Sequence, residues 1–156
     1  MYKNVNKIVL EPHASETPGI KALVSTGYGR GELGKSGLSE PVYVPKTWGH
    51  EMIHVNNELY CSKTLFIKKG CHTSMHFHID KHETMIVIEG RLYIDYIYNK
   101  EVVTHVLEKG EAFVIAPGLP HSLRADEIQS AIIIESSTTS NNEDSIRLPE
   151  ELCYER

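Results

Sequence analysis

The stretch from Gly70 to Gly90 constrains the fold more than any other part of the chain. It places His76 and His78 one residue apart, with Glu83 a short distance further on. Alternate side chains of an extended strand point to the same face, whereas on a helix the same two positions diverge by about 200°. The two imidazoles can therefore share a target only if this segment is a β-strand.

The residues around the histidine pair agree with an extended chain. Thr84–Ile88 is a strand-forming run, and Ile79–His82 is long enough to reverse the chain direction before it. Glu83 then opens the return strand, where its carboxylate can face the two imidazoles. A distant histidine, His121, follows a proline- and glycine-containing turn at residues 116–120 and opens another strand.

Three imidazoles and one carboxylate form a mixed nitrogen and oxygen ligand set for a metal ion. We predict His76, His78, Glu83 and His121 as the ligands. Such a set suits one divalent transition metal (Mn, Fe, Co, Ni or Zn) better than Ca or Mg. On a six-coordinate ion two positions stay open, which is typical of a catalytic site. His82 is a rival ligand, but an adjacent position on a strand faces the other way.

The second half of the chain alternates short strands with turns, which favours a sandwich or closed barrel. Asn99–Lys100 is expected to be a hairpin turn. At 156 residues the chain fits one domain. We assign residues 1–45 to a glycine-rich N-terminal arm and residues 46–156 to the β domain, with a polar, exposed tail at 136–144. Strands are expected at residues 60–67, 91–98, 101–107, 112–116, 122–124 and 129–135.

These residues resemble the cupin superfamily. The first cupin motif is matched by Gly70, His76, His78, Glu83 and Gly90, and the second motif by residues 110–121. The second motif departs at Ala116, where proline is usual, and Ala125 stands where asparagine is common. The resemblance implies an all-β fold, a single-domain cupin jelly-roll β-barrel with an N-terminal arm, and a homodimer in which that arm is a contact.

A longer resemblance is to the type II mannose-6-phosphate isomerase domain. The present chain differs from several members of that family, which have glutamine at the position of His76. It also has Thr84 and Met85 where the family has His-Trp. The resemblance implies sugar or sugar-phosphate chemistry. It is carried by Lys46–Gly49, Lys63, Ser74, Lys81–Glu83, Ile134–Ser137 and Glu143–Arg147.

Three residues are candidates for catalysis. Lys81, between two predicted ligands, could hold a phosphate or stabilise an enediolate oxygen, or be a solvated turn lysine. Lys63 lies within an apolar strand, where a charge is costly unless it is paired, and it is functional only if it faces the interior. Glu135 ends an apolar strand and could act as a general base, or be a plain edge carboxylate.

Ser74, Arg147 and Arg30 are candidates for substrate binding. Arg147 could clamp Asp144 or a phosphate, or form an ordinary surface ion pair. Arg30 lies in the segment 29–36, which matches a phosphate-loop pattern. No helical periodicity follows that pattern, so a nucleotide site is not expected, and a weaker contact of Arg30 with an anionic substrate stays open.

Composition excludes several classes of partner. The net charge of −5 gives no general attraction to nucleic acid or to an anionic membrane. No apolar run approaches the roughly 18 residues that a membrane span needs. The first residues lack a signal-peptide core, and the 3 cysteines fit no disulfide framework, so a cytoplasmic location is expected.

The sequence favours a metal-dependent aldose–ketose isomerase of a sugar or sugar phosphate, working by proton transfer through a metal-stabilised enediolate. Two alternatives stay open. One is an iron-dependent cupin oxygenase that uses the same ligands. The other is a non-enzymatic metal- or carbohydrate-binding module, since a fold does not decide function.

Overall fold

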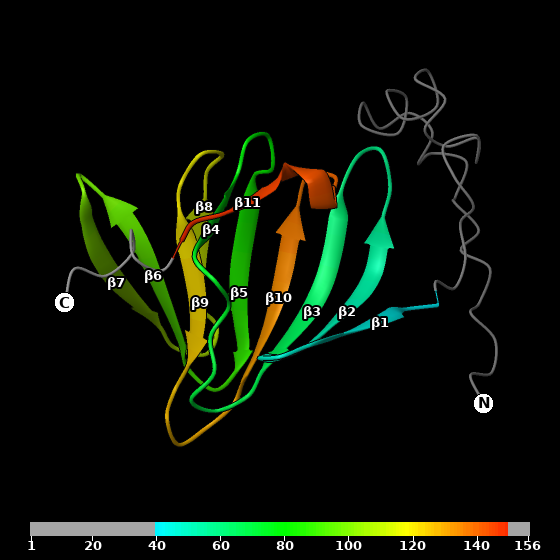
Figure 1. Ribbon diagram of the computed structural model, residues 1–156. Coiled ribbons are helices and arrows are strands. Elements are labelled where there is room, and N and C mark those ends of the chain that lie inside the picture. Colours follow the sequence, from blue (N-terminus) through cyan, green and yellow to red (C-terminus); the bar gives the residue numbers. More distant parts are fainter. Residues whose placement is uncertain (1–39, 150–156) are drawn as a thin grey trace, which may run out of the picture. The chain divides into compact units, whose positions relative to one another are not determined.

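The structure is a computed structural model that describes residues 40–149, so residues 1–39 of the predicted arm, with Arg30, lie outside the described residues. Within that range the chain forms two antiparallel sheets, which confirms the all-β prediction (Figure 1). The first sheet has the order β1 (Val42–Lys46), β2 (Gly49–Asn56), β3 (Cys61–Ile67), β10 (Ala131–Ser137), β5 (Glu83–Glu89) and β8 (Ala112–Ile115). The second has the order β11 (Ser145–Arg147), β4 (His76–His78), β9 (His121–Ala125), β6 (Leu92–Tyr98) and β7 (Glu101–Leu107).

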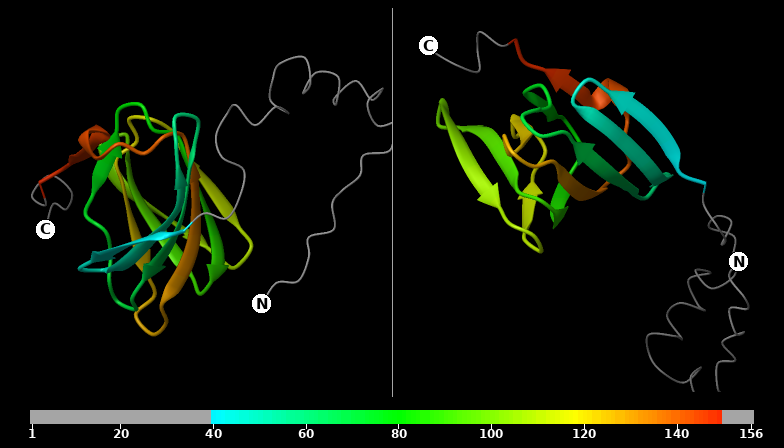
Figure 2. Two further views of the ribbon diagram at one scale, coloured as in Figure 1. Left: turned by 90° about the vertical axis from the view of Figure 1, so that its right-hand side faces the viewer. Right: turned by 90° about the horizontal axis from the view of Figure 1, so that it is seen from below.

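The two sheets face each other, as the views in Figure 2 show, and enclose one apolar core. More buried and less buried positions alternate along the strands because every second side chain points inward. In β3, buried and half-buried positions alternate along the whole strand. The core combines side chains of both sheets, among them Leu65, Ile67, Met85, Val87 and Ile133 from the first and Leu92, Ile94, Leu107 and Leu123 from the second.

Two turns show why particular residues are needed. Asn99 and Lys100 both have positive φ (52° and 69°), the backbone of a two-residue hairpin turn whose twist suits the strands it joins. The predicted hairpin between β6 and β7 is thereby confirmed. Gly90, which ends the first motif, has φ 79°, and a Cβ there would lie 2.2 Å from the carbonyl oxygen of Ser130. Only glycine fits this position without moving the backbone.

The inward-facing side chains change character along four strands, three in the first sheet and one in the second. On β3, Ile67 and Leu65 are followed by Lys63, and on β10, Ile133 is followed by Glu135. The interior therefore has an apolar end and a charged end. The charged end contains Lys63 of β3, Glu83 of β5, His121 of β9 and Glu135 of β10, and the apolar end contains Ile67, Val87, Ala125 and Ala131 of the same strands.

Three strands were not anticipated from the sequence: β1, β2 and the short β11. The predicted boundary between residues 45 and 46 falls inside β1, which pairs with β2 from Val42 to Lys46. Only one face of β10 is fully buried, because Ile132 and Ile134 point to the outside of the sheet and are half-buried. Among residues 40–149 there is no helix with the length and apolar character that crossing a bilayer requires.

Candidate metal centre and pocket

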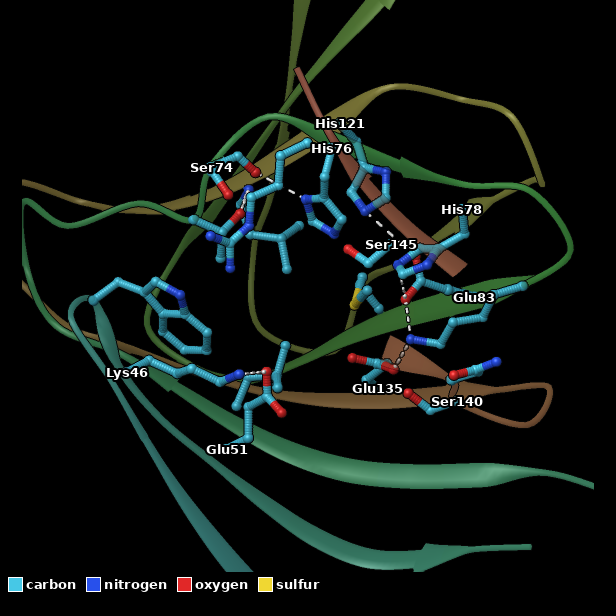
Figure 3. A pocket seen from close by; sticks show the side chains of 18 residues that line it. Lys46, Glu51, Ser74, His76, His78, Glu83, His121, Glu135, Ser140 and Ser145 are labelled. Carbon is cyan, nitrogen blue, oxygen red and sulfur yellow. Dashed lines mark hydrogen bonds and ion pairs between the residues drawn. The ribbon is translucent and has the colours of Figure 1, made fainter. Parts of the chain in front are cut away.

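The fold brings the four predicted ligands to the charged end of the interior. His76 and His78 lie on β4, and His76 is paired with His121 on the neighbouring strand β9. Glu83 is the first residue of β5 in the opposite sheet. Figure 3 shows the three imidazoles and this carboxylate directed toward one another across the space between the sheets. His82, the rival ligand, is exposed.

Backbone carbonyls fix the orientation of two imidazoles. His76 Nδ1 lies 2.8 Å from the carbonyl oxygen of Ser74, and His121 Nδ1 lies 2.9 Å from that of Leu119. A carbonyl oxygen only accepts hydrogen bonds, so in both rings Nδ1 donates and Nε2 keeps its lone pair. A metal-binding imidazole is held in the same way, with its second nitrogen bonded to a carbonyl or carboxylate.

The donor atoms are spaced as an ion between them would require. His121 Nε2 lies 3.3 Å from Glu83 Oε2, and His78 Nε2 lies 3.7 Å from Glu83 Oε1. Two ligands at about 2.1 Å from a shared ion are separated by about 3.0–4.2 Å. Glu83 Oε2 is buried without a hydrogen-bond partner, and it faces the lone pair of His121. A cation between these two acceptors would satisfy both, so these residues fit a metal ion.

The ligand set is not fully closed around one point. No group of three or more His, Cys, Asp or Glu side chains in the described part of the chain already has the spacing of a complete metal site. The ring centroids of His76 and His78 are 5.2 Å apart, and those of His78 and His121 are 6.2 Å apart. One oxygen of Glu83 is also engaged by Lys81. The metal ligands therefore stay a prediction.

The electrostatic environment favours the neutral forms of His76 and His78 and the charged form of Glu83. Burial and the neighbouring His121 lower the pKa of His76 to about 4. Burial also lowers the pKa of His78, although Glu83 opposes this effect. Burial acts to raise the pKa of Glu83, but the nearby His121 and the charge of Lys81 outweigh it and leave this pKa below its ordinary value. Neutral imidazole and ionised carboxylate are the forms that bind metals.

A buried lysine links the predicted ligand to a second carboxylate. Lys81 Nζ donates to Glu83 Oε1 and to Glu135 Oε1, both at 2.5 Å. Burial alone would lower the pKa of Lys81, but Glu135 and Glu83 together raise it. Lys63 Nζ lies 3.6 Å from the same Glu135 oxygen and 3.8 Å from Glu51 Oε2. Lys81, Lys63 and Glu135 are thus buried and paired, not solvated.

The four predicted ligands, together with Lys81 and Glu135, line a polar cavity of about 640 Å³. Of the other predicted site residues, Ser74 and Arg147 line the cavity. Lys63 does not line it, and Arg30 is outside the described residues. The side chain of Arg147 forms no ion pair with another residue of the range 40–149, in contrast to Lys46, which pairs with Glu51 across the cavity from the histidines (Figure 3).

Some site residues were missed by sequence reasoning. Trp48 packs against the core and also lines the cavity, as do Lys46 and Glu51. The prediction of an exposed tail at residues 136–144 was wrong at Ser137, which is buried, and at Ser140 and Asp144, which are half-buried. The alternation of β-branched residues in Val42–Val44 was the only local signal for the β1–β2 hairpin that carries Lys46 and Glu51.

Fold and site together define a double-sheeted β-barrel protein with a histidine- and carboxylate-lined interior. The cupin family model matches residues 44–152, and the chain belongs to this family. The match confirms the predicted jelly-roll architecture and the cupin part of the resemblance. Among curated proteins no significant sequence match was found.

Solved structures with the same fold are distant in sequence. The capsular polysaccharide assembling protein CapF from Staphylococcus aureus has a TM-score of 0.63 and 17% identity over 70% of this chain and 34% of its own. The W96Y oxalate decarboxylase of Bacillus subtilis has a TM-score of 0.62 and 18% identity over 75% of this chain and 34% of its own. The chain therefore spans about a third of the length of these proteins (34%), and the likeness shows the fold alone.

Proposed function

We propose that the protein is a metal-dependent isomerase of an open-chain sugar or sugar phosphate, as in the type II mannose-6-phosphate isomerase domain that the sequence resembles. One observation carries the proposal: three imidazoles and Glu83 converge at one wall of a cavity where a second buried carboxylate, Glu135, lies one lysine away. A divalent transition metal bound there would supply a Lewis acid that polarises a carbonyl.

Aldose–ketose isomerisation consumes no co-reactant. A base takes a proton from the hydroxyl-bearing carbon and returns it to the neighbouring carbonyl carbon, while a second proton passes between the two oxygens. Glu135 is the candidate base, because its side chain lines the cavity and its Oε1 is held by Lys81. The Lys81 ammonium is placed to stabilise negative charge on a substrate oxygen and to pass the second proton.

The cavity rim offers groups for the rest of such a substrate. Arg147 makes no ion pair with the described residues, so its guanidinium is available to a phosphate. Ser74 and Ser140 offer hydroxyls to sugar oxygens. The similarity to a capsular polysaccharide assembling protein agrees with carbohydrate as the substrate class, although at 17% identity it shows the fold alone.

The test is to incubate metal-loaded protein with a panel of sugars and sugar phosphates in deuterated water. We expect interconversion of an aldose and a ketose, with deuterium at the exchanged carbon. Glu135→Gln should abolish turnover while metal binding is kept, and Arg147→Ala should raise KM for a phosphorylated substrate more than for its unphosphorylated analogue. The absence of both interconversion and deuterium uptake across the panel would refute the isomerase. Oxygen consumption with Fe(II) would favour the oxygenase instead.

A further inference from the structure

The chain segment after β10 crosses back to the strand that carries two predicted ligands. The short 3-10 helix η2 (Asn142–Asp144) is followed directly by β11, which pairs with β4. Ser145 is opposite His78 and Arg147 is opposite His76 in this pairing. On its other side β4 is paired with β9 at a single position, His76 with His121. All three residues of β4 are therefore paired with β11, whereas only one is paired with β9.

Asp144, at the end of η2, also holds the turn that connects β4 with β5. Its Oδ1 accepts hydrogen bonds from the backbone N–H groups of Ile79 (2.9 Å) and Asp80 (3.1 Å). Its Oδ2 accepts one from the backbone N–H of Lys81 (3.1 Å). Three successive amides of the turn thus end on one carboxylate, and this turn sets the distance between His78 on one sheet and Glu83 on the other.

The same carboxylate lies beside the imidazole of His78. Nδ1 of His78 is buried and has no hydrogen-bond partner, and Asp144 Oδ2 is 3.6 Å away from it. This distance is slightly too long for a hydrogen bond. When Nε2 of a histidine binds a cation, the ring proton resides on Nδ1 and needs an acceptor. A shift of a few tenths of an ångström would make Asp144 that acceptor.

We propose that Asp144 is the positioning residue of the metal centre: it fixes the 79–81 turn and orients His78 so that Nε2 faces the ion. The inference rests on the proposed metal centre but not on the isomerase reaction. The imidazoles of His76 and His121 are oriented by carbonyl oxygens, so Asp144 supplies for the third imidazole what the backbone supplies for the other two.

The test compares metal affinity in two matched variants. Asp144→Asn loses the charge and one acceptor, and we expect about 10- to 100-fold weaker binding of Zn(II) or Co(II) in a chelator competition, together with a changed Co(II) visible spectrum. Glu143→Gln removes a charge from the neighbouring exposed residue of η2 and should stay close to the unaltered protein, because an exposed charge is screened. Equal affinities of the two variants would overturn the proposal.

A measurement on the unaltered protein covers the case in which Asp144→Asn does not fold. In the Zn(II)-loaded protein, the nitrogen resonances of His78 should report a proton on Nδ1 in a hydrogen bond, whereas a proton on Nε2 would overturn the role of Asp144. The two proposals fail separately. Unaltered protein that takes up no metal would refute the proposed centre, and unaltered protein that binds metal as tightly as Asp144→Asn would refute only the role of Asp144.

Discussion

The apolar and charged ends of the barrel interior are made by the same strands, yet they are stabilised in different ways. At the apolar end, Ile67, Val87 and Ile133 are almost completely buried and need no partner other than another side chain. At the charged end, Glu83 and Lys81 are as deeply buried, but each depends on groups of opposite charge. Each apolar side chain contributes about 1.5–3 kcal/mol through burial, whereas buried ion pairs roughly balance their desolvation cost.

The comparison shows that the apolar end stabilises the fold, whereas the charged end adds little net stability. A charged interior is retained although apolar residues would pack there at no electrostatic cost, which is typical of a functional site. The predictions below test this division, from the largest expected effect to the smallest.

The first prediction concerns the lysine between the two carboxylates. Lys81→Met leaves Glu83 and Glu135 buried without their common partner, which costs about 3–5 kcal/mol in the free energy of unfolding of the metal-free protein. Urea denaturation measures this loss. Lys81→Arg is the matched control, because it keeps the charge. A Met variant as stable as the unaltered protein would show that the charged end is solvated in solution.

The second prediction concerns the apolar end. Ile133 is fully buried between the sheets, so Ile133→Ala removes apolar contacts and leaves a cavity, at a cost of about 2–5 kcal/mol. The same denaturation experiment measures it. Ile132→Ala, on the outer face of the same strand and half-buried, should cost clearly less. Equal losses at both positions would mean that the inner face is not the main core.

The third prediction separates the two ends by means of the metal. A metal at about 100 times its dissociation constant should stabilise the folded protein by about 2.7 kcal/mol. His76→Ala should lose most of this increment, because it removes a predicted ligand. Ile133→Ala should keep the full increment although it is less stable. Thermal unfolding with and without the metal measures both, and an increment that survives in His76→Ala would remove this residue from the ligand set.

The fourth prediction is the pH dependence of the metal-free protein. The pKa of His76 is about 4 in the folded chain against an ordinary value of 6.5. Between these values the unfolded chain binds a proton that the folded chain does not, so stability falls as the pH drops below 6.5. Between pH 6.5 and 5 we expect a loss of about 1–2 kcal/mol.

Glu83 acts in a different pH window. Its pKa is depressed below the ordinary value of 4.5, so its contribution is present above that pH and is lost only below it. His76→Ala should therefore make the stability curve less steep between pH 6.5 and about 4 and leave the part below pH 4 unchanged. A curve with the same slope in the His76→Ala variant would contradict the predicted cause.

Sequence reasoning located the strands that carry their own pattern. The His76–His78 pair, the run from Thr84 and the Asn99–Lys100 turn are local signals, and the structure confirms the strands and the hairpin that they predict. It did not find β11, which has three residues and exists only because β4 lies beside it. Nor could it find the role of Asp144, since the amides that this side chain binds are more than sixty positions earlier (|i−j| 63 to 65).

The separation of the two ends also bears on how such a chain can diverge over evolutionary time. Substitutions at Lys81, Glu135 or Arg147 alter the chemistry of the cavity and leave the packing around Ile67 and Val87 untouched. Descendants of one ancestral barrel can therefore acquire new substrates through the exchange of a few side chains at the charged end. The packing at the apolar end preserves the architecture meanwhile.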